Sequence, residues 1–397
     1  MKPFSTFLGV GGFEFSQHER QYLNRVMDSQ ILSYGPACVE FEQRFAKGHQ
    51  SQHAVVCNSG TSALHMAVAA LKEKRGWTKE TEIILPALTF VATLNMIMEE
   101  DIKPVFVDID PKTYNIDPRS IEAAITPNTG AIMVVHLFGQ PCEMDLISQI
   151  AKKHSLEIIE DSAETMFASF DGKSVGSFGA VGCFSTYMAH ILTTGVGGLC
   201  TAQTDEMAGL LRSIMNHGRD PVYISPNVEM KHGGISRREM IQRRFKFVRQ
   251  GYSYRMTEME AALGLGQLDR MDDMIAKRRW NANFLISGLQ KWQEKIQLPY
   301  VHPKAEHSYM VFPVVLRDKK ISKWDLMLHL ETLNIETREM VPLTNQPCYK
   351  NLIEFPHTPH TDWVNESGFY IGCHSFMDVA ALRHIIAAFD EFFENIK

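Results

Sequence analysis

A single histidine stands in a turn between two short apolar runs near the middle of the chain. Residues 181–186 read as a buried strand, His190 follows in the turn, and a glycine-rich segment leads to a second apolar run at 199–202. Ligands bind outside the carboxyl ends of parallel strands, so a side chain on such a turn is well placed for chemistry. Imidazole accepts and donates protons near neutral pH. The pattern predicts an acid or base at His190, with a satisfied core histidine as the alternative.

A second candidate site follows the strand predicted at residues 54–57. Gly60 permits a tight backbone turn, and the hydroxyls and amides of Thr61 and Ser62 fall at the start of the next predicted helix. A helix N-terminus binds anions, because its first N–H groups are unpaired and its dipole is positive there. An ordinary serine or threonine cap is the competing interpretation. The spacing therefore indicates an anion site, with a plain helix start left open.

Acidic and aromatic side chains come directly after two other predicted strands. Asp161 and Glu164 follow the buried run at 156–159, where an acid is costly unless it has a partner such as a protonated ring nitrogen or a salt-bridging cation. Phe90 follows the run at 83–85, and its ring suits either a flat cofactor or the core. Together with the anion site and the histidine turn, these are the parts needed to hold pyridoxal phosphate.

The elements that must position these residues alternate along the chain. Short β-rich runs separated by helix-compatible segments predict a parallel sheet wrapped by helices. After about Arg270 this pattern loosens into a long helical stretch, strand-like runs and a C-terminal helix. We therefore expect a large domain over residues 1–270 and a smaller α+β domain over residues 271–397. The polar segment from Pro221 to Arg244 is predicted to be an exposed excursion.

Composition excludes several classes of protein. The 397 residues carry a formal net charge of −6 and are 45% hydrophobic, which suits roughly two domains and argues against a binder of nucleic acid or membrane surfaces. The seven cysteines form no CxxC or CxC pair, so we expect neither a disulfide framework nor a metal site. Since no leader or membrane span is recognisable, a cytoplasmic location is expected.

Motifs along nearly the whole chain resemble those of the DegT/StrS-type nucleotide-sugar aminotransferases, a family of fold type I pyridoxal-phosphate enzymes. The matching motifs occur in the family's order: Ser33-Tyr-Gly35, Ser59-Gly-Thr-Ser-Ala63, Pro86-Ala-Leu-Thr-Phe90, Val107-Asp-Ile-Asp110, Glu160-Asp-Ser-Ala163, Gly176–Gly179, Phe184–Gly198 and Gly251–Glu258. The resemblance implies an α/β large domain with a mainly parallel seven-stranded sheet flanked by helices. It also implies a smaller C-terminal α+β domain.

The same resemblance implies a role for each candidate residue. The cofactor site would be formed by Gly60, Thr61, Ser62, Phe90, Asp161, Glu164 and Ser185. In that site the glycine and hydroxyls would bind the phosphate, Phe90 would stack on the pyridine ring, and Asp161 would keep the ring nitrogen protonated. Glu164 stands where many of the family's aminotransferases have glutamine. Contacts with cofactor or substrate are expected further along the chain, with solvent-exposed positions as the alternative, at His217, Arg219 and Arg338.

One position departs from the family pattern. The transaminases have a lysine at the end of Phe-Ser-x-Tyr-x-x-Lys that binds the cofactor covalently, and this chain has His190 there. Imidazole has no primary amine, so pyridoxal or pyridoxamine phosphate would be held noncovalently while the histidine acts as a general base. The change resembles the 3-dehydratase branch of the family, such as the GDP-4-keto-6-deoxymannose 3-dehydratases. That branch removes the C3 hydroxyl of nucleotide-linked 4-keto-6-deoxysugars.

Three functions remain open at this point. The first is 3-dehydration in deoxysugar or O-antigen biosynthesis, with glutamate as amino donor. The second is glutamate-dependent transamination by an enzyme whose lysine has been replaced, naturally or by engineering. The third is non-catalytic binding of a nucleotide sugar. For all three, the resemblance implies a homodimer whose sites borrow residues across the interface, and the excursion at 221–244 and Ser253 are expected to contribute.

Overall fold

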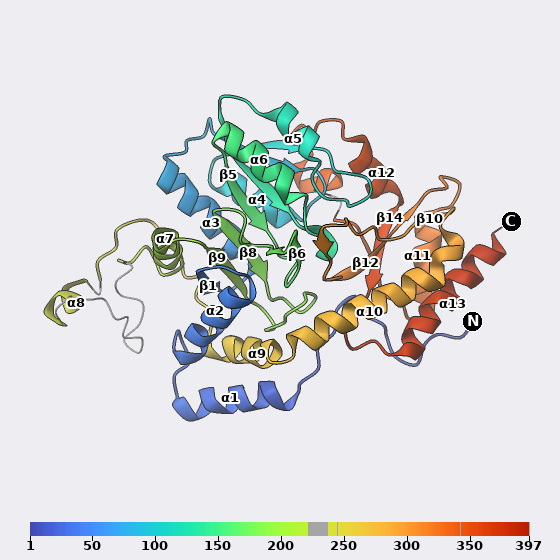
Figure 1. Ribbon diagram of the computed structural model, residues 1–397, viewed down its shortest axis with the longest axis horizontal. Helices are drawn as coiled ribbons and strands as arrows, with labels where there is room; N and C mark the ends of the chain where they lie inside the picture. Colours follow the sequence, from blue (N-terminus) through green and yellow to red (C-terminus); the bar gives the residue numbers. More distant parts are fainter. Residues whose placement is uncertain (221–236, 244, 342, 397) are drawn as a thin grey trace.

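The computed structural model describes residues 1–220, 237–243, 245–341 and 343–396 (Figure 1). The excursion predicted from Pro221 to Arg244 therefore lies outside the described residues, apart from the short helix α8 (Arg237–Arg243). No helix in the described ranges is long and apolar enough to cross a bilayer.

A seven-stranded sheet forms the centre of the larger part of the fold. Its strands lie in the order β1 (His53–Cys57), β9 (Gly198–Ala202), β8 (Val181–Ser185), β5 (Glu157–Asp161), β4 (Thr129–Val135), β2 (Glu82–Pro86) and β3 (Lys103–Val107). Only β9 runs antiparallel to its neighbours among these strands. The mainly parallel seven-stranded sheet expected from the sequence is confirmed. Its strands are buried on both faces, as helices on each side require.

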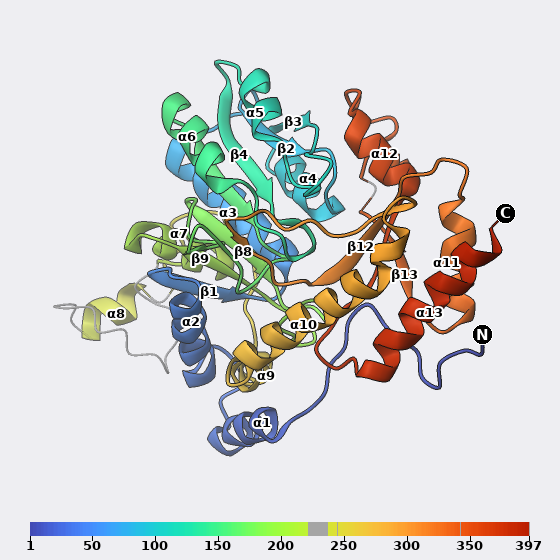
Figure 2. The ribbon, with the colours of Figure 1, turned by 45° about the vertical axis from the view of Figure 1, so that its right-hand side comes forward.

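Helices cover both faces of this sheet (Figures 1 and 2). They are α2 (Pro36–Gly48), α3 (Gly60–Arg75), α4 (Val91–Glu99), α5 (Pro118–Ala124), α6 (Met144–His154) and α7 (Asp205–Met215). The helix α3 contacts α4 and α7, whereas α5 contacts α6. Most of the apolar side chains of α3 are fully buried, so its N-terminus is held firmly above the strand ends.

A second, antiparallel sheet lies towards the C-terminus (Figure 2). Its order is β10 (Ile296–Gln297), β12 (Val311–Leu316), β14 (Gly368–Gly372) and β13 (Thr337–Glu339). The helices of this region are α10 (Met271–Leu289), α11 (Lys323–Thr332), α12 (Pro359–Ser367) and α13 (Val379–Asn395). A small three-stranded sheet pairs two strands of the first region, β6 (Ser169–Phe170) and β7 (Lys173–Ser174), with one strand of the second, β11 (Ala305–Glu306).

Three apolar clusters accompany the two main sheets, two of them against the seven-stranded sheet. The cluster of the C-terminal sheet combines Leu8 with residues from 282 to 393, so the N-terminal segment packs with that sheet. The start of α10 contributes Met271 and Met274 to the larger cluster of the seven-stranded sheet instead. The division after residue 270 stays a prediction, because buried apolar contacts continue across it.

The helices begin at the signals that the sequence carries. A capping box of Ser16 and Glu19 starts α1 (Gln17–Ser29), and one of Thr257 and Glu260 starts α9 (Glu258–Leu268). Proline occupies the first turn of α2, where its missing N–H costs nothing. Local chemistry is therefore sufficient to explain where these helices begin.

The buried carboxylate of Glu258 ties α9 to the start of α2. Its oxygens accept the backbone N–H groups of Gly35 at 2.6 Å, Ala37 at 2.8 Å and Cys38 at 3.0 Å. Gly35 has no side chain to cap this helix, so Glu258 satisfies the first N–H groups from more than 200 residues away.

We expect Glu258→Ala to lower the free energy of unfolding by about 2–4 kcal/mol, because three buried donors lose a charged acceptor. Urea denaturation measures the change, and Glu40→Ala on the half-exposed side of α2 is the control, with an expected effect below about 0.5 kcal/mol. Equal effects for the two variants would contradict this role of Glu258.

Candidate active site

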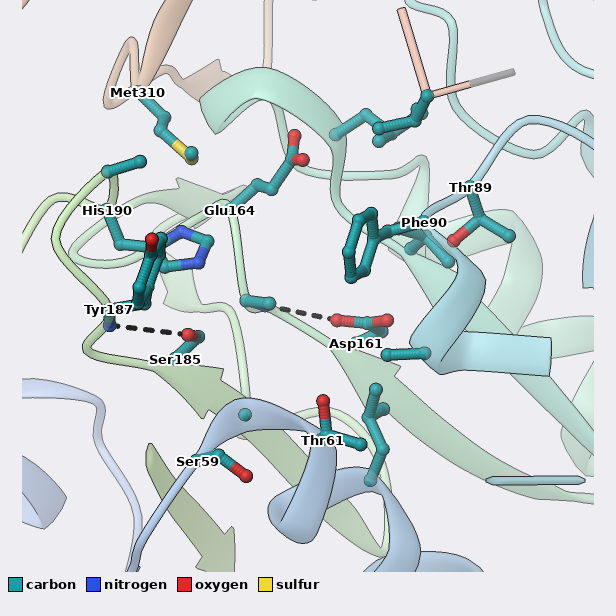
Figure 3. A pocket seen from close by; sticks show the side chains of 18 of the residues that line it. Ser59, Thr61, Thr89, Phe90, Asp161, Glu164, Ser185, Tyr187, His190 and Met310 are labelled. Carbon is teal, nitrogen blue, oxygen red and sulfur yellow. Dashed lines mark hydrogen bonds between the residues drawn. The ribbon is translucent and has the colours of Figure 1, made fainter. Parts of the chain in front are cut away.

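A cavity of about 370 Å³ lies at the carboxyl ends of β5 and β8, bordered by residues of the C-terminal sheet (Figure 3). The predicted site residues that line it are Gly60, Thr61, Phe90, Asp161, Glu164, Ser185, His190 and Arg338. Residues separated by up to 278 positions in the sequence are thus brought to one place, at the strand ends where α/β folds bind ligands.

The turn after β8 carries His190 into the wall of this cavity. The backbone N–H of His190 donates to the carbonyl of Tyr187 at 2.9 Å, and the N–H of Thr194 donates to the carbonyl of Thr186 at 2.8 Å, which closes the turn. His190 Nδ1 is buried and has no hydrogen-bond partner. This placement does not fit a satisfied core histidine, and the role of His190 as an acid or base stays a prediction. No lysine occurs among the described residues that line the cavity.

Burial lowers the pKa of His190 to about 4, and the positive charge of the buried Arg278 acts in the same direction. The imidazole is therefore neutral at neutral pH. A neutral imidazole with an unpaired nitrogen at the cavity wall can accept a proton from a bound molecule.

The start of α3 forms the expected anion cradle. Ser59 Oγ accepts the N–H of Ser62 at 3.0 Å and caps the helix, which leaves Gly60 and Thr61 at the cavity. A Cβ atom on Gly60 would lie 2.6 Å from Cβ of Ser185, so only glycine permits this close approach of α3 to β8. The unpaired N–H groups of the first turn thus face a space suited to a phosphate.

The hydroxyl of Ser62 is occupied elsewhere. It donates to Asn58 Oδ1 at 2.7 Å and lies 2.9 Å from Ser59 Oγ, and Ser62 does not line the cavity. The prediction that Ser62 binds the cofactor is not supported by this placement, because its side chain helps to hold the turn before the helix. The sequence alone could not separate this capping role from ligand binding.

We expect Gly60→Ala to push α3 and Ser185 apart and weaken cofactor binding about tenfold or more. Overpacking costs about 1–3 kcal/mol, and about 1.4 kcal/mol corresponds to a tenfold change in affinity. Equilibrium dialysis with pyridoxal phosphate measures the dissociation constant. Thr78→Ala, in the loop after α3, is the control that should leave it unchanged. An unaltered constant for Gly60→Ala would show that the close approach does not matter.

The end of β5 directs two adjacent acids to opposite sides of the sheet. Glu160 faces away from the cavity and accepts three backbone N–H groups of residues 176–179 at 2.7 to 2.8 Å. Asp161 lines the cavity, where its carboxylate accepts the hydroxyl of Thr93 at 2.7 Å and the N–H of Ala163 at 3.2 Å. The strand period of two explains why only one of the pair faces the cavity.

Asp161 has no cationic partner at ion-pair distance among the described residues. Its burial raises the pKa of the carboxyl group, since desolvation disfavours the charge. A protonated ring nitrogen in the cavity would supply the missing positive charge. The salt bridge considered as an alternative for Asp161 is therefore not found within the described chain.

Phe90 lies immediately before α4 at the edge of the cavity. Its side chain is 58% exposed although it is apolar, which argues against the alternative of core packing. Figure 3 shows the ring across the cavity from His190. A flat ligand between them would cover this exposed ring, and stacking on a pyridine ring stays our prediction for Phe90.

Two predicted substrate contacts are not part of this cavity. His217 is exposed in a turn after α7 and does not line the cavity. The guanidinium of Arg219 lies over the rings of Phe245 at 5.1 Å and Phe247 at 5.8 Å. Within one chain, neither residue reaches a ligand in the cavity. The third prediction, Arg338 on β13, does line the cavity, and its guanidinium is held by Glu336 at 2.7 and 2.9 Å.

Sequence reasoning missed several residues of the cavity wall. Tyr187 stands inside the Phe-Ser-x-Tyr pattern, and that motif was the signal that could have identified it. Tyr370 comes from β14 of the C-terminal sheet and Met310 immediately precedes β12 of that sheet, and no local pattern marks them. Their positions depend on how that sheet meets the strand ends of the large sheet.

The residues present fit pyridoxal phosphate. A helix start offers N–H groups for the phosphate, an exposed ring offers a stacking surface, and a buried carboxylate lacks the cation that a protonated pyridine ring provides. With the doubly covered parallel sheet, this arrangement is that of a fold type I pyridoxal-phosphate enzyme.

The chain belongs to the DegT/DnrJ/EryC1/StrS aminotransferase family, whose model matches residues 14–390. It is 34% identical over 387 residues to GDP-perosamine synthase of Caulobacter vibrioides, covering 97% of this chain and 98% of that protein. It is also 30% identical over 382 residues to GDP-4-keto-6-deoxy-D-mannose 3-dehydratase of Escherichia coli O55:H7, covering 93% and 96%.

A comparison with a solved structure also supports the fold and the family. The fold matches that of Escherichia coli GDP-4-keto-6-deoxy-D-mannose-3-dehydratase with bound hydrated PLP at a TM-score of 0.86 and 26% identity, covering 96% of this chain and 99% of that one. The family, the fold class and the cofactor expected from the sequence are confirmed. The chain is an enzyme that uses pyridoxal phosphate, and its relatives include both an aminotransferase and a dehydratase.

Proposed function

We propose that this enzyme removes the C3 hydroxyl, as water, from a nucleotide-linked 4-keto-6-deoxysugar, with His190 as general base. The observation that carries the proposal is the neutral, unpaired imidazole in a cavity wall whose described residues include no lysine. The names of two relatives favour GDP as the nucleotide and a place in deoxysugar biosynthesis.

Pyridoxamine phosphate, when bound, supplies an amino group that reacts with a ketone and a ring that withdraws electrons. The protein's own residues would bind and orient the cofactor and move the proton. The first turn of α3 would bind the phosphate, Asp161 would hold the ring nitrogen in its protonated form, and Phe90 would keep the ring in place. His190 is neutral above a pH of about 4 and can therefore remove a proton across the working range.

Transamination is the second candidate, and one observation favours it. The chain is 34% identical over nearly its whole length to GDP-perosamine synthase, which by its name makes an amino sugar. In such a reaction His190 would have to move protons without a covalent bond to the cofactor. Binding without catalysis, the third alternative, conflicts with the family to which the chain belongs.

We also propose a homodimer in which the second copy completes the site. Phe245 is 77% exposed and Phe247 is 51% exposed, and such aromatic side chains on a surface favour an interface. His217, Arg219 and Ser253 lie on the same part of the chain, outside the cavity of their own subunit. Sedimentation of the purified protein tests this, and a monomer at micromolar concentration would contradict it.

The direct test of function is an assay of the purified enzyme with pyridoxamine phosphate, glutamate and GDP-4-keto-6-deoxymannose. Mass spectrometry of the nucleotide sugar should show the net loss of one oxygen atom, because the C3 hydroxyl leaves as water and a hydrogen atom takes its place. Gain of an amine with the oxygen atoms otherwise retained would favour transamination, and an unchanged sugar would favour binding alone. The dTDP-linked ketosugar in a parallel reaction tests the choice of nucleotide.

A further inference from the structure

Elimination of a hydroxyl needs a proton donor as well as a base, because hydroxide is a poor leaving group. Glu164 lies in the cavity wall, four residues after the buried Glu160. Its Oε2 atom accepts the backbone N–H of Phe138 at 3.0 Å, which fixes the carboxyl group in place. Figure 3 shows this carboxyl group pointing away from Asp161, on the side of the cavity where Met310 lies.

The surroundings of Glu164 favour its protonated form. The titratable and charged groups that line the same cavity are Asp161, Tyr187, His190, Arg338 and Tyr370. Among them the one permanent cation, Arg338, bonds Glu336, and Glu164 forms no ion pair within the described ranges. Burial raises the pKa of Glu164 to about 7, and the negative charge of Asp161 adds to this. A substantial fraction of this carboxyl group therefore carries a proton at neutral pH.

We propose that Glu164 is the general acid that protonates the C3 oxygen of the sugar as it leaves. This inference rests on the proposed dehydration. The proton passes from the Glu164 carboxyl group to the C3 oxygen, the C3–O bond breaks with its electron pair on oxygen, and water departs. The electron pair that expels it comes from the C–H bond on the amino-bearing carbon of pyridoxamine phosphate, whose proton His190 removes. One proton is taken and one is given, and pyridoxamine phosphate is the reductant that supplies the two electrons gained by the sugar.

The two carboxyl oxygens of Glu164 have different roles. Oε2 is held by the N–H of Phe138, so Oε1 is the oxygen free to carry the proton towards the cavity. His190 and Glu164 line the same cavity from different segments, one on the turn after β8 and one after β5. A base and an acid on separate segments can act on two positions of one substrate.

The first test compares leaving groups in the complete enzyme. Glu164→Gln should lower kcat about 10²- to 10⁴-fold on GDP-4-keto-6-deoxymannose. Fluoride leaves without a proton, so on the 3-deoxy-3-fluoro analogue the loss should be no more than about threefold. Glu306→Gln, on the exposed strand β11, is the control that should match the wild type on both. Equal losses on both substrates would overturn the inference and indicate a structural role.

The second test does not depend on turnover. In cofactor-free protein labelled with ¹³C-glutamate, one carboxyl resonance should titrate near pH 7 and be absent from Glu164→Gln. If every glutamate titrates in the ordinary acidic range, the inference is overturned. Failure of the proposed function is distinguishable, because wild-type enzyme would then form no 3-deoxysugar from the hydroxyl substrate whatever the resonance shows.

Discussion

Replacement of His190 by asparagine is expected to lower kcat by about 10²- to 10⁴-fold while the cofactor still binds. Asparagine approaches the size of histidine and is neutral, as the buried imidazole is, so the cavity should keep its shape. It cannot accept a proton, however, and that is the property the proposed reaction requires. Formation of the 3-deoxysugar followed by mass spectrometry measures turnover, and the absorbance of bound cofactor measures occupancy.

A matched control is His357→Asn, because the side chain of His357 is 83% exposed and lies outside the cavity. It should leave both readouts unchanged. Wild-type turnover by His190→Asn would rule out the general base. In a further variant, His190→Lys, a primary amine at the same position should bind pyridoxal phosphate covalently, and borohydride reduction followed by mass spectrometry would detect the adduct.

Replacement of Asp161 by asparagine is expected to lower kcat by a similar factor, about 10²- to 10⁴-fold, and also to weaken cofactor binding. The reason is the loss of the one buried negative charge that faces the expected position of the ring nitrogen. An amide cannot hold that nitrogen in its charged form, so the ring would withdraw electrons less strongly. Turnover and the dissociation constant of pyridoxamine phosphate measure the two effects.

Thr93→Val is the graded comparison for Asp161. It removes one hydroxyl donor to Asp161 Oδ2, at 2.7 Å, and leaves the charge in place. A loss of about 1–2 kcal/mol in stabilisation of the carboxylate corresponds to roughly tenfold in rate. If Asp161→Asn were no more harmful than Thr93→Val, the charge would not matter and pairing with a ring nitrogen would be wrong.

The short-range features of the site could be predicted from the chain alone. Gly60 before a helix, Asp161 at a strand end and His190 on a glycine-flanked turn are each marked by neighbours within a few residues. Their shared position at the carboxyl edge follows from the alternation of strands and helices. The structure places all three around one cavity, as that rule requires.

Predictions that depended on a single residue type receive less support from where the structure places the side chains. Ser62 has the right residue type next to Thr61, but its hydroxyl donates to Asn58, and only the actual geometry separates a cap from a ligand contact. His217 lies beyond the end of α7, where its side chain is exposed and does not line the cavity. The local sequence does not determine the direction in which a side chain points after a turn.

Local patterning in this chain was therefore sufficient for the mainly parallel sheet, because that depends on period and spacing, and the ordered motifs were sufficient for the resemblance to the family, in which His190 stands at the position of the lysine. Tertiary packing determined which other residues line the cavity and the surroundings of its titratable groups. It brought Tyr370 of β14 and Met310, which precedes β12, to the cavity, partly shielded the imidazole of His190 from water, and left the half-buried carboxyl group of Glu164 without a cation among the described residues. These properties arise from contacts between distant segments, since burial and neighbouring charge set protonation.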